Sequence, residues 1–368
     1  MNRRAFLATG LLAGTIIGAG IFSLPYIFKE VGLATGFFYL IFFTAVYWII
    51  HWMYAKILEI QPEEHQFFNL SKKYFAPFFA NFASFLILFE LIFVLVVYLI
   101  LSPVFAQIAF GRSMTTLVPV LFFWLISSIF AFANLKWFGI AEFFGTIVIL
   151  VIVGLTFFLG SSSPLEINFF NKMDFGIFFL PFGPLLFSLS GRPALHKVVE
   201  AWRKSGKSFS LNKVVGWGTV IPAVVYFIFV VGILRLNPNI APEALNSLSF
   251  LPPFFLSVFG WLGLITLWTS YFVIAANVKD IFALDLKYPR WGAALLSLFA
   301  PLILYFLVSK EFLPVLSFTG GVFLAIESIF VVMIWHKAFP NHPYRAFTLL
   351  LYAVFVLALG YEIFKFVF

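Results

Sequence analysis

The sequence contains no cysteine and few charged residues. Of its 368 residues, 10% are Asp, Glu, Lys or Arg, whereas 63% are hydrophobic. A soluble domain carries about 25% charged residues, because charges must cover its surface. The shortage of charge therefore excludes a soluble enzyme, a nucleic-acid-binding protein and a disordered scaffold. The absence of cysteine excludes disulfides, thiolate metal sites and cysteine nucleophiles.

Long apolar runs fill most of the chain. A helix that crosses a bilayer needs about 20 mostly apolar residues, and these runs are continuous rather than alternating, which argues against a β-barrel. The sequence thus predicts an all-α polytopic membrane protein, with the lipid bilayer as its surroundings. We expect eleven transmembrane helices, at residues 5–28, 33–57, 77–108, 117–134, 137–160, 175–199, 213–236, 253–281, 291–309, 312–336 and 345–367.

The basic residues between these spans are distributed unevenly. Of the 23 Lys and Arg residues, sixteen fall on one side of the membrane and six on the other, with Arg192 inside a span. Since basic loops stay in the cytoplasm, we expect a cytoplasmic N-terminus and an external C-terminus. The net charge of +8 then reflects topology. Neither nucleic acid nor an obligate protein partner is expected.

The N-terminus resembles a twin-arginine export signal, because Arg3 and Arg4 precede an apolar run. No small-residue cleavage site follows, and ten further spans do. We therefore interpret residues 1–28 as the first membrane helix.

Two spans contain glycine and proline near their middle. The first has Gly14, Gly18, Gly20 and Pro25, and the sixth runs from Phe182 to Pro193 with a small polar centre. Glycines alone favour a close helix-packing face. However, the two spans hold corresponding positions in two halves of five spans, which is typical of the central site of a secondary transporter. Unpaired backbone groups there can hold the carboxylate and ammonium of an amino acid. No residue-level repeat between the halves is visible.

Four features of the sequence resemble the amino acid/auxin permease family, and most closely its prokaryotic hydroxy/aromatic amino acid permease branch. This family lies within the amino acid–polyamine–organocation superfamily. The four features are Gly14-Thr15-Ile16-Ile17-Gly18-Ala19-Gly20-Ile21 with Leu24-Pro25, Phe187-Ser188-Leu189-Ser190-Gly191, Thr269-Ser270-Tyr271 with Asp280 and Asp285, and the eleven-span plan.

The resemblance implies a LeuT-type fold, in which two inverted repeats of five helices are followed by one extra helix. The repeats would span about 5–160 and 175–336, and the extra helix 345–367, within a single transmembrane domain of residues 1–368. It also implies a secondary active amino acid transporter, working as an ion-coupled symporter with alternating access in a prokaryotic inner membrane. No cofactor other than a sodium ion is expected.

The resemblance also implies a substrate site at the two interrupted helices. Gly18 and the amides of Ala19 and Gly20 would meet the substrate carboxylate. The substrate amine would meet the carbonyl groups of Ile16 and Phe187 together with Ser188 and Ser190. Where the aromatic permeases carry a bulkier or His-containing stretch, this chain has Ser190-Gly191-Arg192, so an aromatic preference is not implied.

A sodium site is implied by the same resemblance, and hard cations prefer such oxygen ligands. Its ligands would be the backbone of Gly14 and Ile17, the Thr266 carbonyl, and the hydroxyls of Thr269 and Ser270. Ile21 stands where the second sodium site of the founding fold needs an amide, so that site is expected to be absent. The fifth span has no central lysine, which favours sodium over a proton. Alternatively, the hydroxyls only bond a carbonyl within their own helix.

Ionisable residues at membrane depth are costly unless they are paired. Arg192 in the sixth span needs an anion, and we expect Glu327 in the tenth span to supply it. Glu90 in the third span is either a second partner or a protonatable site. The Arg192–Glu327 pair is either an inner gate or a structural contact. His51 is expected to be a packed histidine, whereas Glu142 and His196 are expected to be solvated.

Three other classes of function are alternatives to a symporter. A membrane-embedded enzyme needs clustered His, Asp or Glu, but the five histidines are scattered. A channel needs a filter or rings of charge, and none is visible. An amino acid exchanger or a non-transporting nutrient receptor on the same fold stays open. The sequence does not indicate which amino acid is bound.

Overall fold

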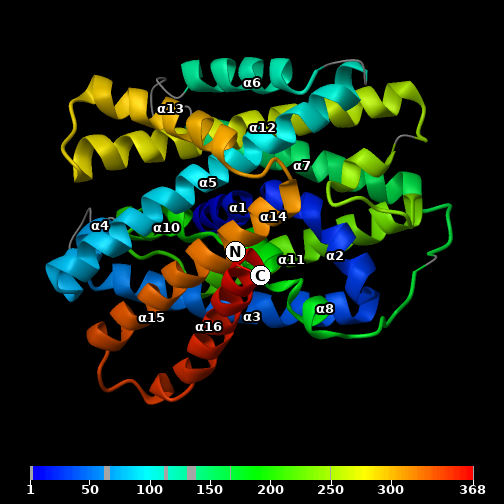
Figure 1. Cartoon of the computed structure of the whole chain (residues 1–368). Helices are drawn as coiled ribbons and strands as arrows, with labels where there is room; N and C mark the ends of the chain where they lie inside the picture. Colours follow the sequence, from blue (N-terminus) through cyan, green and yellow to red (C-terminus); the bar gives the residue numbers. More distant parts are fainter. Residues whose placement is uncertain are drawn as a thin grey trace.

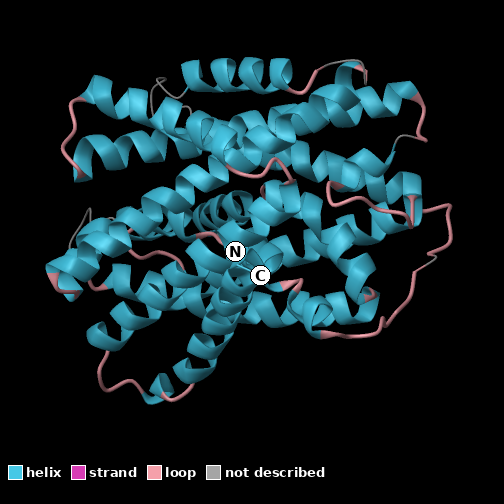
Figure 2. Ribbon diagram, in the orientation of Figure 1, coloured by secondary structure: helices cyan, strands magenta, loops and turns pink. Residues whose placement is uncertain are grey.

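A computed structural model describes residues 3–61, 67–111, 115–130, 138–165, 167–248 and 250–367. Within these residues the chain is helical and contains no strand (Figure 2), in agreement with the predicted all-α class. The elements are α1 (Arg3–Ile16), η1 (Ala19–Ser23), α2 (Leu24–Val31), α3 (Leu33–Glu59), α4 (Phe67–Tyr74), α5 (Pro77–Phe110), α6 (Leu117–Phe130), α7 (Phe138–Gly160), α8 (Phe175–Phe179), α9 (Phe182–Leu189), α10 (Arg192–Lys204), α11 (Leu211–Leu236), η3 (Ala244–Leu248), α12 (Pro253–Asp280), η4 (Ile281–Asp285), α13 (Arg290–Leu307), α14 (Phe312–Phe318), η5 (Thr319–Leu324), α15 (Ala325–Ala338), η6 (Pro343–Arg345) and α16 (Thr348–Val367).

Nine helices of the described chain are long and apolar enough to cross a bilayer, and ten are if the bent pair at the N-terminus forms one span. This makes the chain an integral, multi-pass membrane protein. The predicted span 117–134 coincides with the shorter apolar helix α6, and its last residues lie outside the described part. The prediction of eleven transmembrane helices is therefore matched in position, while its exact count stays a prediction.

The turn between α2 and α3 is covered by the segment that joins α7 to α8. Gly32 has a φ of +88°, and a Cβ atom there would lie 2.7 Å from the Phe169 carbonyl oxygen. Glycine is needed on both counts. The Leu33 and Ala34 amides donate to the carbonyls of Asn168 and Phe169. The connection between the two predicted repeats is thereby fixed to the end of the first broken span.

The helices pack in two groups that α7 joins. α1, α3, α9, α10 and α11 contact one another, together with η1 and α2, and we call this group the bundle. α5, α6, α12 and α13 form the second group, the scaffold. Figure 1 shows α6, α12 and α13 at the top, α3 at the bottom, and α1 between them. α7 contacts both α11 and α12, so a seam between bundle and scaffold runs beside α1.

The first half of the tenth predicted span contacts α9 backbone to backbone. A Cβ atom on Gly320 in η5 would lie 2.0 Å from the Gly183 carbonyl oxygen. Small residues of this kind let membrane helices approach closely. η5 is a π-helix, a form often found at functional positions. The contact holds α9, the first half of the second broken span, against α14 and η5.

Candidate substrate and ion site

The first span is interrupted where the sequence predicts. α1 ends at Ile16, and η1 with α2 continues at an angle of 48°. Between them Gly18 has φ −129° and ψ −156°, which is an extended and not a helical conformation. Pro25 stands in the first turn of α2, where a missing backbone donor costs nothing. The amides of Ala19 and Gly20 therefore lie at a helix start, without partners inside the helix.

The sixth span is interrupted as well. α9 ends at Leu189, and Ser190 is extended with ψ 131°. α10 begins at Arg192, with Pro193 as the next residue in its first turn. The last four carbonyl groups of a helix have no partner within it. In α9 those groups include the carbonyls of Phe187 and Ser188. Both interruptions consequently bring backbone polar groups into the middle of the membrane.

The two interruptions touch at Gly20 and Ser188. A Cβ atom on Gly20 would lie 2.4 Å from the Ser188 Oγ and 2.8 Å from its Cα. The Ser188 hydroxyl itself donates to the Pro184 carbonyl at 2.7 Å, one turn back in α9. Only glycine fits between η1 and α9 at this point, so the first motif acts through the absence of a side chain.

Tyr226 on α11 joins both interruptions. Its hydroxyl oxygen lies 2.7 Å from the Ile16 carbonyl and 2.7 Å from the Ser188 carbonyl. A phenol has a single proton to donate, so it pairs with one carbonyl at a time and leaves the other short of a donor. Tyr226 belongs to none of the sequence motifs. Its only signal was an aromatic residue with a polar tip in an otherwise apolar span.

His51 on α3 is hydrogen-bonded through both ring nitrogens. The Gly191 amide donates to Nε2 at 3.1 Å, and Nδ1 lies 2.9 Å from the Thr219 hydroxyl oxygen. Thr219 in turn donates to the Val215 carbonyl. Nε2 is thus the acceptor, and Nδ1 carries the proton. His51 is packed, as expected, but it also connects α3, α11 and the break before α10.

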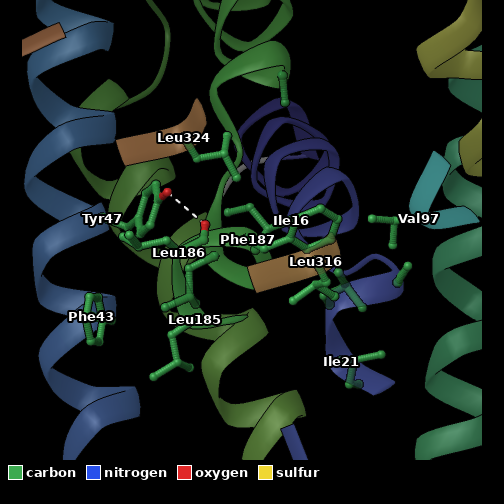
Figure 3. Close-up of a cluster of buried hydrophobic side chains, with 14 of the residues drawn as sticks. Ile16, Ile21, Phe43, Tyr47, Val97, Leu185, Leu186, Phe187, Leu316 and Leu324 are labelled. Carbon is green, nitrogen blue, oxygen red and sulfur yellow. Dashed lines mark hydrogen bonds between the residues drawn. The ribbon is translucent and has the colours of Figure 1, made fainter. Parts of the chain in front are cut away.

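A second side chain of α3 supports the end of α9. The Tyr47 hydroxyl donates to the Leu186 carbonyl at 2.8 Å. Figure 3 shows this bond near Ile16 and Phe187, which lie where α1 and α9 end. Together with the bonds of Tyr226 and His51, this contact ties α1, α9 and the start of α10 to α3 and α11. The hydroxyl and imidazole groups thereby make the bundle one unit.

One cavity of about 110 Å³ lies at the two interruptions. It is lined by all seven predicted substrate residues, and by Gly14, Ile17 and Ser270 of the predicted sodium site. Thr266 and Thr269 do not line it. The other walls are mostly apolar and come from α5, α7, α10 and α12. They include Leu91, Val94, Tyr98, Gly145, Thr146, Val273 and Ile274, with Lys197 and Asn277 at one end.

An aromatic cluster joins η1, α5 and α11 beyond the cavity-lining residues of α5. The ring of Phe22 in η1 lies 5.0 Å from that of Phe105 and 5.9 Å from that of Phe229, both edge to face. All three side chains are buried. Along α5, Glu90 and Tyr98 line the cavity and Phe105 follows them. The cavity is thus lined by the α5 residues that precede this cluster, while the three Phe rings pack against one another.

Threonine hydroxyls of α7 and α12 pack against glycines of α1 and α7 at the predicted sodium site. A Cβ atom on Gly14 would lie 2.5 Å from the Thr146 Oγ1, and one on Gly145 would lie 2.3 Å from the Thr269 Oγ1. The Thr269 hydroxyl donates to the Thr266 carbonyl at 2.9 Å. This is the alternative to sodium binding, in which the hydroxyl bonds a carbonyl within its own helix. The Thr266 hydroxyl is buried without a hydrogen-bond partner. Sodium binding by these residues stays a prediction.

Divalent metals find no comparable ligand group in the part of the chain that the structure describes. No three His, Cys, Asp or Glu side chains gather there. The oxygens of the predicted sodium site are hydroxyls and carbonyls, without a carboxylate. Such a neutral set suits a monovalent better than a divalent cation.

Arg192 lies between two carboxylates. Its Nε contacts Glu327 on α15, and its Nη2 lies 3.8 Å from the Glu90 Oε2 on α5. All three side chains are buried. The predicted gating residues are thus in one cluster, which joins the bundle to α15 and to the scaffold.

The remaining ionisable candidates are placed differently from one another. His196 was expected to be solvated, but this is wrong: it is half-buried and its Nε2 lies 2.6 Å from the Tyr54 hydroxyl. The reason is that α10 packs against α3. The side chains of Glu142 and Asp285 lie outside the described part.

Comparison with known proteins supports the fold and the class. The family model described as "Transmembrane amino acid transporter protein" matches residues 1–282. No curated protein matches the sequence significantly.

Three solved structures show the same fold at low sequence identity. A manganese transporter of Eremococcus coleocola, in complex with an aromatic bis-isothiourea substituted compound, is 11% identical with a TM-score of 0.68, over 98% of this chain and 87% of that one. Mhp1, a nucleobase-cation-symport-1 family transporter with bromovinylhydantoin bound, is 12% identical with a TM-score of 0.65, over 97% and 91%. MhsT in complex with L-phenylalanine is 13% identical with a TM-score of 0.60, over 100% and 98%. The chain therefore has the LeuT-type transporter fold.

Proposed function

Since the chain belongs to the transmembrane amino acid transporter family, we propose that it is an ion-coupled symporter that binds an amino acid between its two broken spans. The observation that carries this proposal is the cavity, because residues from both interruptions line it together. Family membership also separates the chain from membrane-embedded enzymes.

The two ends of an amino acid would find opposite backbone groups in the cavity. The carboxylate would meet the amides of Ala19 and Gly20 at the start of η1, where the helix end is partially positive. The ammonium would meet the carbonyl of Phe187 at the end of α9, where the partial charge is negative. The Ile16 carbonyl is shared with Tyr226. Both contacts use backbone atoms, so they recognise the part common to all amino acids.

The side chain of the substrate would face apolar walls. Leu91, Val94, Val273 and Ile274 line the cavity beyond the two breaks. Burying an apolar group stabilises a complex by about 25 cal/mol per Å², whereas an unpaired charge there would be costly. This favours amino acids with a neutral side chain.

Alternating access would come from motion of the bundle against the scaffold. Hydrogen bonds from Tyr47, His51 and Tyr226 stay within the bundle, whereas the Arg192–Glu90 contact crosses the seam to the scaffold. With the predicted orientation, the part of the cavity near Lys197 would lie toward the cytoplasm and the Phe22 cluster toward the outside. Arg192 would act as the inner gate, holding α10 until the seam opens.

The transport energy would come from an ion gradient. The oxygens of Gly14, Ile17, Thr266, Thr269 and Ser270 would hold sodium between α1 and α12. A bound cation there would join bundle and scaffold, which is how binding at one site changes access at another. Two alternatives on the same fold are an amino acid exchanger and a nutrient receptor.

Uptake into proteoliposomes tests the proposal. A labelled mixture of L-amino acids would be offered under an imposed sodium gradient and, separately, a proton gradient. We expect accumulation that follows an imposed ion gradient and is competed by particular neutral amino acids. Substrate exchange without accumulation would identify the exchanger, and binding without flux the receptor. A complete lack of binding would contradict the amino acid assignment.

A further inference from the structure

The cluster at Arg192 contains two carboxyl groups but one guanidinium. The three side chains come from α10, α5 and α15, and each is at most 10% exposed. If both carboxylates were ionised, the cluster would carry a net charge of −1 inside the membrane. An uncompensated charge at that depth costs several kcal/mol.

No other group around the cluster supplies a second buried cation in the part of the chain that the structure describes. His196 is paired with Tyr54, since its Nε2 lies 2.6 Å from the Tyr54 hydroxyl oxygen. Lys197 is exposed and lines the cavity. The titratable groups that face the cluster are Tyr47 and Tyr54 on α3 and His196 on α10. Tyr98 on α5 and Lys197 on α10 line the same cavity as Glu90.

A proton is the simplest compensating charge, and Glu90 is the better place for it. Arg192 contacts Glu327 closely, whereas Glu90 is 3.8 Å away. The Oε2 of Glu90 is buried and has no hydrogen-bond partner. Glu90 also lines the cavity, which gives water a route to the carboxyl. We propose that Glu90 binds one proton from the cavity and carries it through the transport cycle.

The proton would decide which carboxylate holds Arg192. With Glu90 protonated, Arg192 pairs with Glu327 and ties α10 to α15. When the cavity fills with water, the Glu90 carboxylic acid releases its proton to water and becomes a carboxylate. Glu90 then competes for Arg192 and draws α10 toward α5. Proton release is thereby linked to movement across the seam, in addition to any sodium bound elsewhere. This inference rests on the proposed transport function.

The experiment measures proton movement and substrate movement separately. Proteoliposomes with an entrapped pH-sensitive dye would receive an outside substrate without a sodium gradient. We expect the wild-type interior to acidify as substrate enters. Glu90→Gln keeps the shape of the side chain and should lose both acidification and proton-driven accumulation. Exchange of internal for external substrate needs no net proton, so Glu90→Gln should retain it. Glu362→Gln on α16, another buried carboxyl away from Arg192, serves as the matched control and should acidify normally.

The outcomes separate this inference from the function on which it rests. A wild type that neither accumulates nor exchanges any amino acid would overturn the transport proposal. Acidification that persists in Glu90→Gln would overturn the proton site while leaving transport intact. If Glu90→Gln does not fold, infrared difference spectra of the wild type give the answer instead. We expect a protonated carboxyl band that is lost when the cavity opens, and the absence of such a band at every pH would contradict the proposal.

Discussion

At the scale of single residues, the site depends on backbone atoms that a few side chains hold in place. Tyr226 is the clearest case, because its hydroxyl meets two carbonyls with one proton. One of these carbonyls is short of a donor until something else supplies one. An ammonium group entering the cavity is a donor of the required kind.

Tyr226→Phe should reduce the stability of the substrate-free protein by about 1–3 kcal/mol, because both buried carbonyls then lack a donor. Substrate should recover more stability in this variant than in the wild type. Thermal unfolding with and without substrate measures both effects. Tyr271→Phe is the matched control, since the Tyr271 hydroxyl is buried without a hydrogen-bond partner and its loss should be neutral. Equal changes in thermal stability in the two variants, with and without substrate, would contradict a role of the Tyr226 hydroxyl in holding the two carbonyls.

Gly20→Ala should reduce uptake by about tenfold or more, because overpacking of this kind costs about 1–3 kcal/mol. The new methyl group would meet Ser188 at 2.4 Å and push η1 from α9. Gly10→Ala on α1 is the control, since nothing lies within 4 Å of a Cβ atom there. Initial uptake rates, normalised to inserted protein, give the comparison. Wild-type uptake by Gly20→Ala would remove the first span from the substrate site.

At the scale of whole elements, the interruptions were predictable but their supports were not. Glycine and proline act locally, so the sequence indicates that α1 and α9 stop near Ile16 and Leu189. The groups that hold the ends lie far along the chain, as with Tyr226 and Ile16, or His51 and Gly191. No periodicity within one helix specifies such a pair. In contrast, the Arg192–Glu327 contact was predictable, because a cationic side chain inside a membrane span needs an anionic partner and few acidic residues lie within the spans.

The close approach of α7 to α12 and α1 gives a test of the ion site at element level. Gly145→Ala places a methyl group 2.3 Å from the Thr269 Oγ1 and should displace this hydroxyl from its present position. The sodium concentration for half-maximal uptake should rise about tenfold, which corresponds to about 1.4 kcal/mol. Gly154→Ala on the same helix, with nothing within 4 Å, should leave it unchanged. An unaltered sodium response in Gly145→Ala would contradict sodium binding by these oxygens.

At the scale of the molecule, the low charge content already specified a membrane protein, and the motif pairing specified its transporter class. The arrangement of bundle, scaffold and seam was not predictable, because it arises from contacts between helices such as α5 and α12 that share no sequence signal. The aromatic cluster beyond the cavity was not predictable from the sequence either. It depends on the packing of Phe22, Phe105 and Phe229, which come from three different elements.

Because the chain has no cysteine, an introduced thiol reports access without other substitutions. Asn277→Cys at the cavity end should react with a water-soluble maleimide, and substrate with its coupling ion should slow the reaction as the cavity closes. Ser208→Cys, exposed between α10 and α11, should react at the same rate in both conditions. Labelling rates in detergent provide the measurement. Identical protection at both positions, or none at 277, would argue against alternating access.

The length of α5 has a consequence for how the protein sits in its membrane. Its 34 residues extend about 50 Å at 1.5 Å per residue, whereas the hydrocarbon layer is about 30 Å thick. A helix exposed to lipid would relieve that difference by following the bilayer. In the most apolar stretch of α5, 83% is buried within the protein. The inclination of α5 is therefore fixed by the neighbouring helices. Thinning or thickening of the bilayer therefore acts on the lipid-facing helices, while the inclined α5 keeps its angle and the cavity beside it keeps its depth.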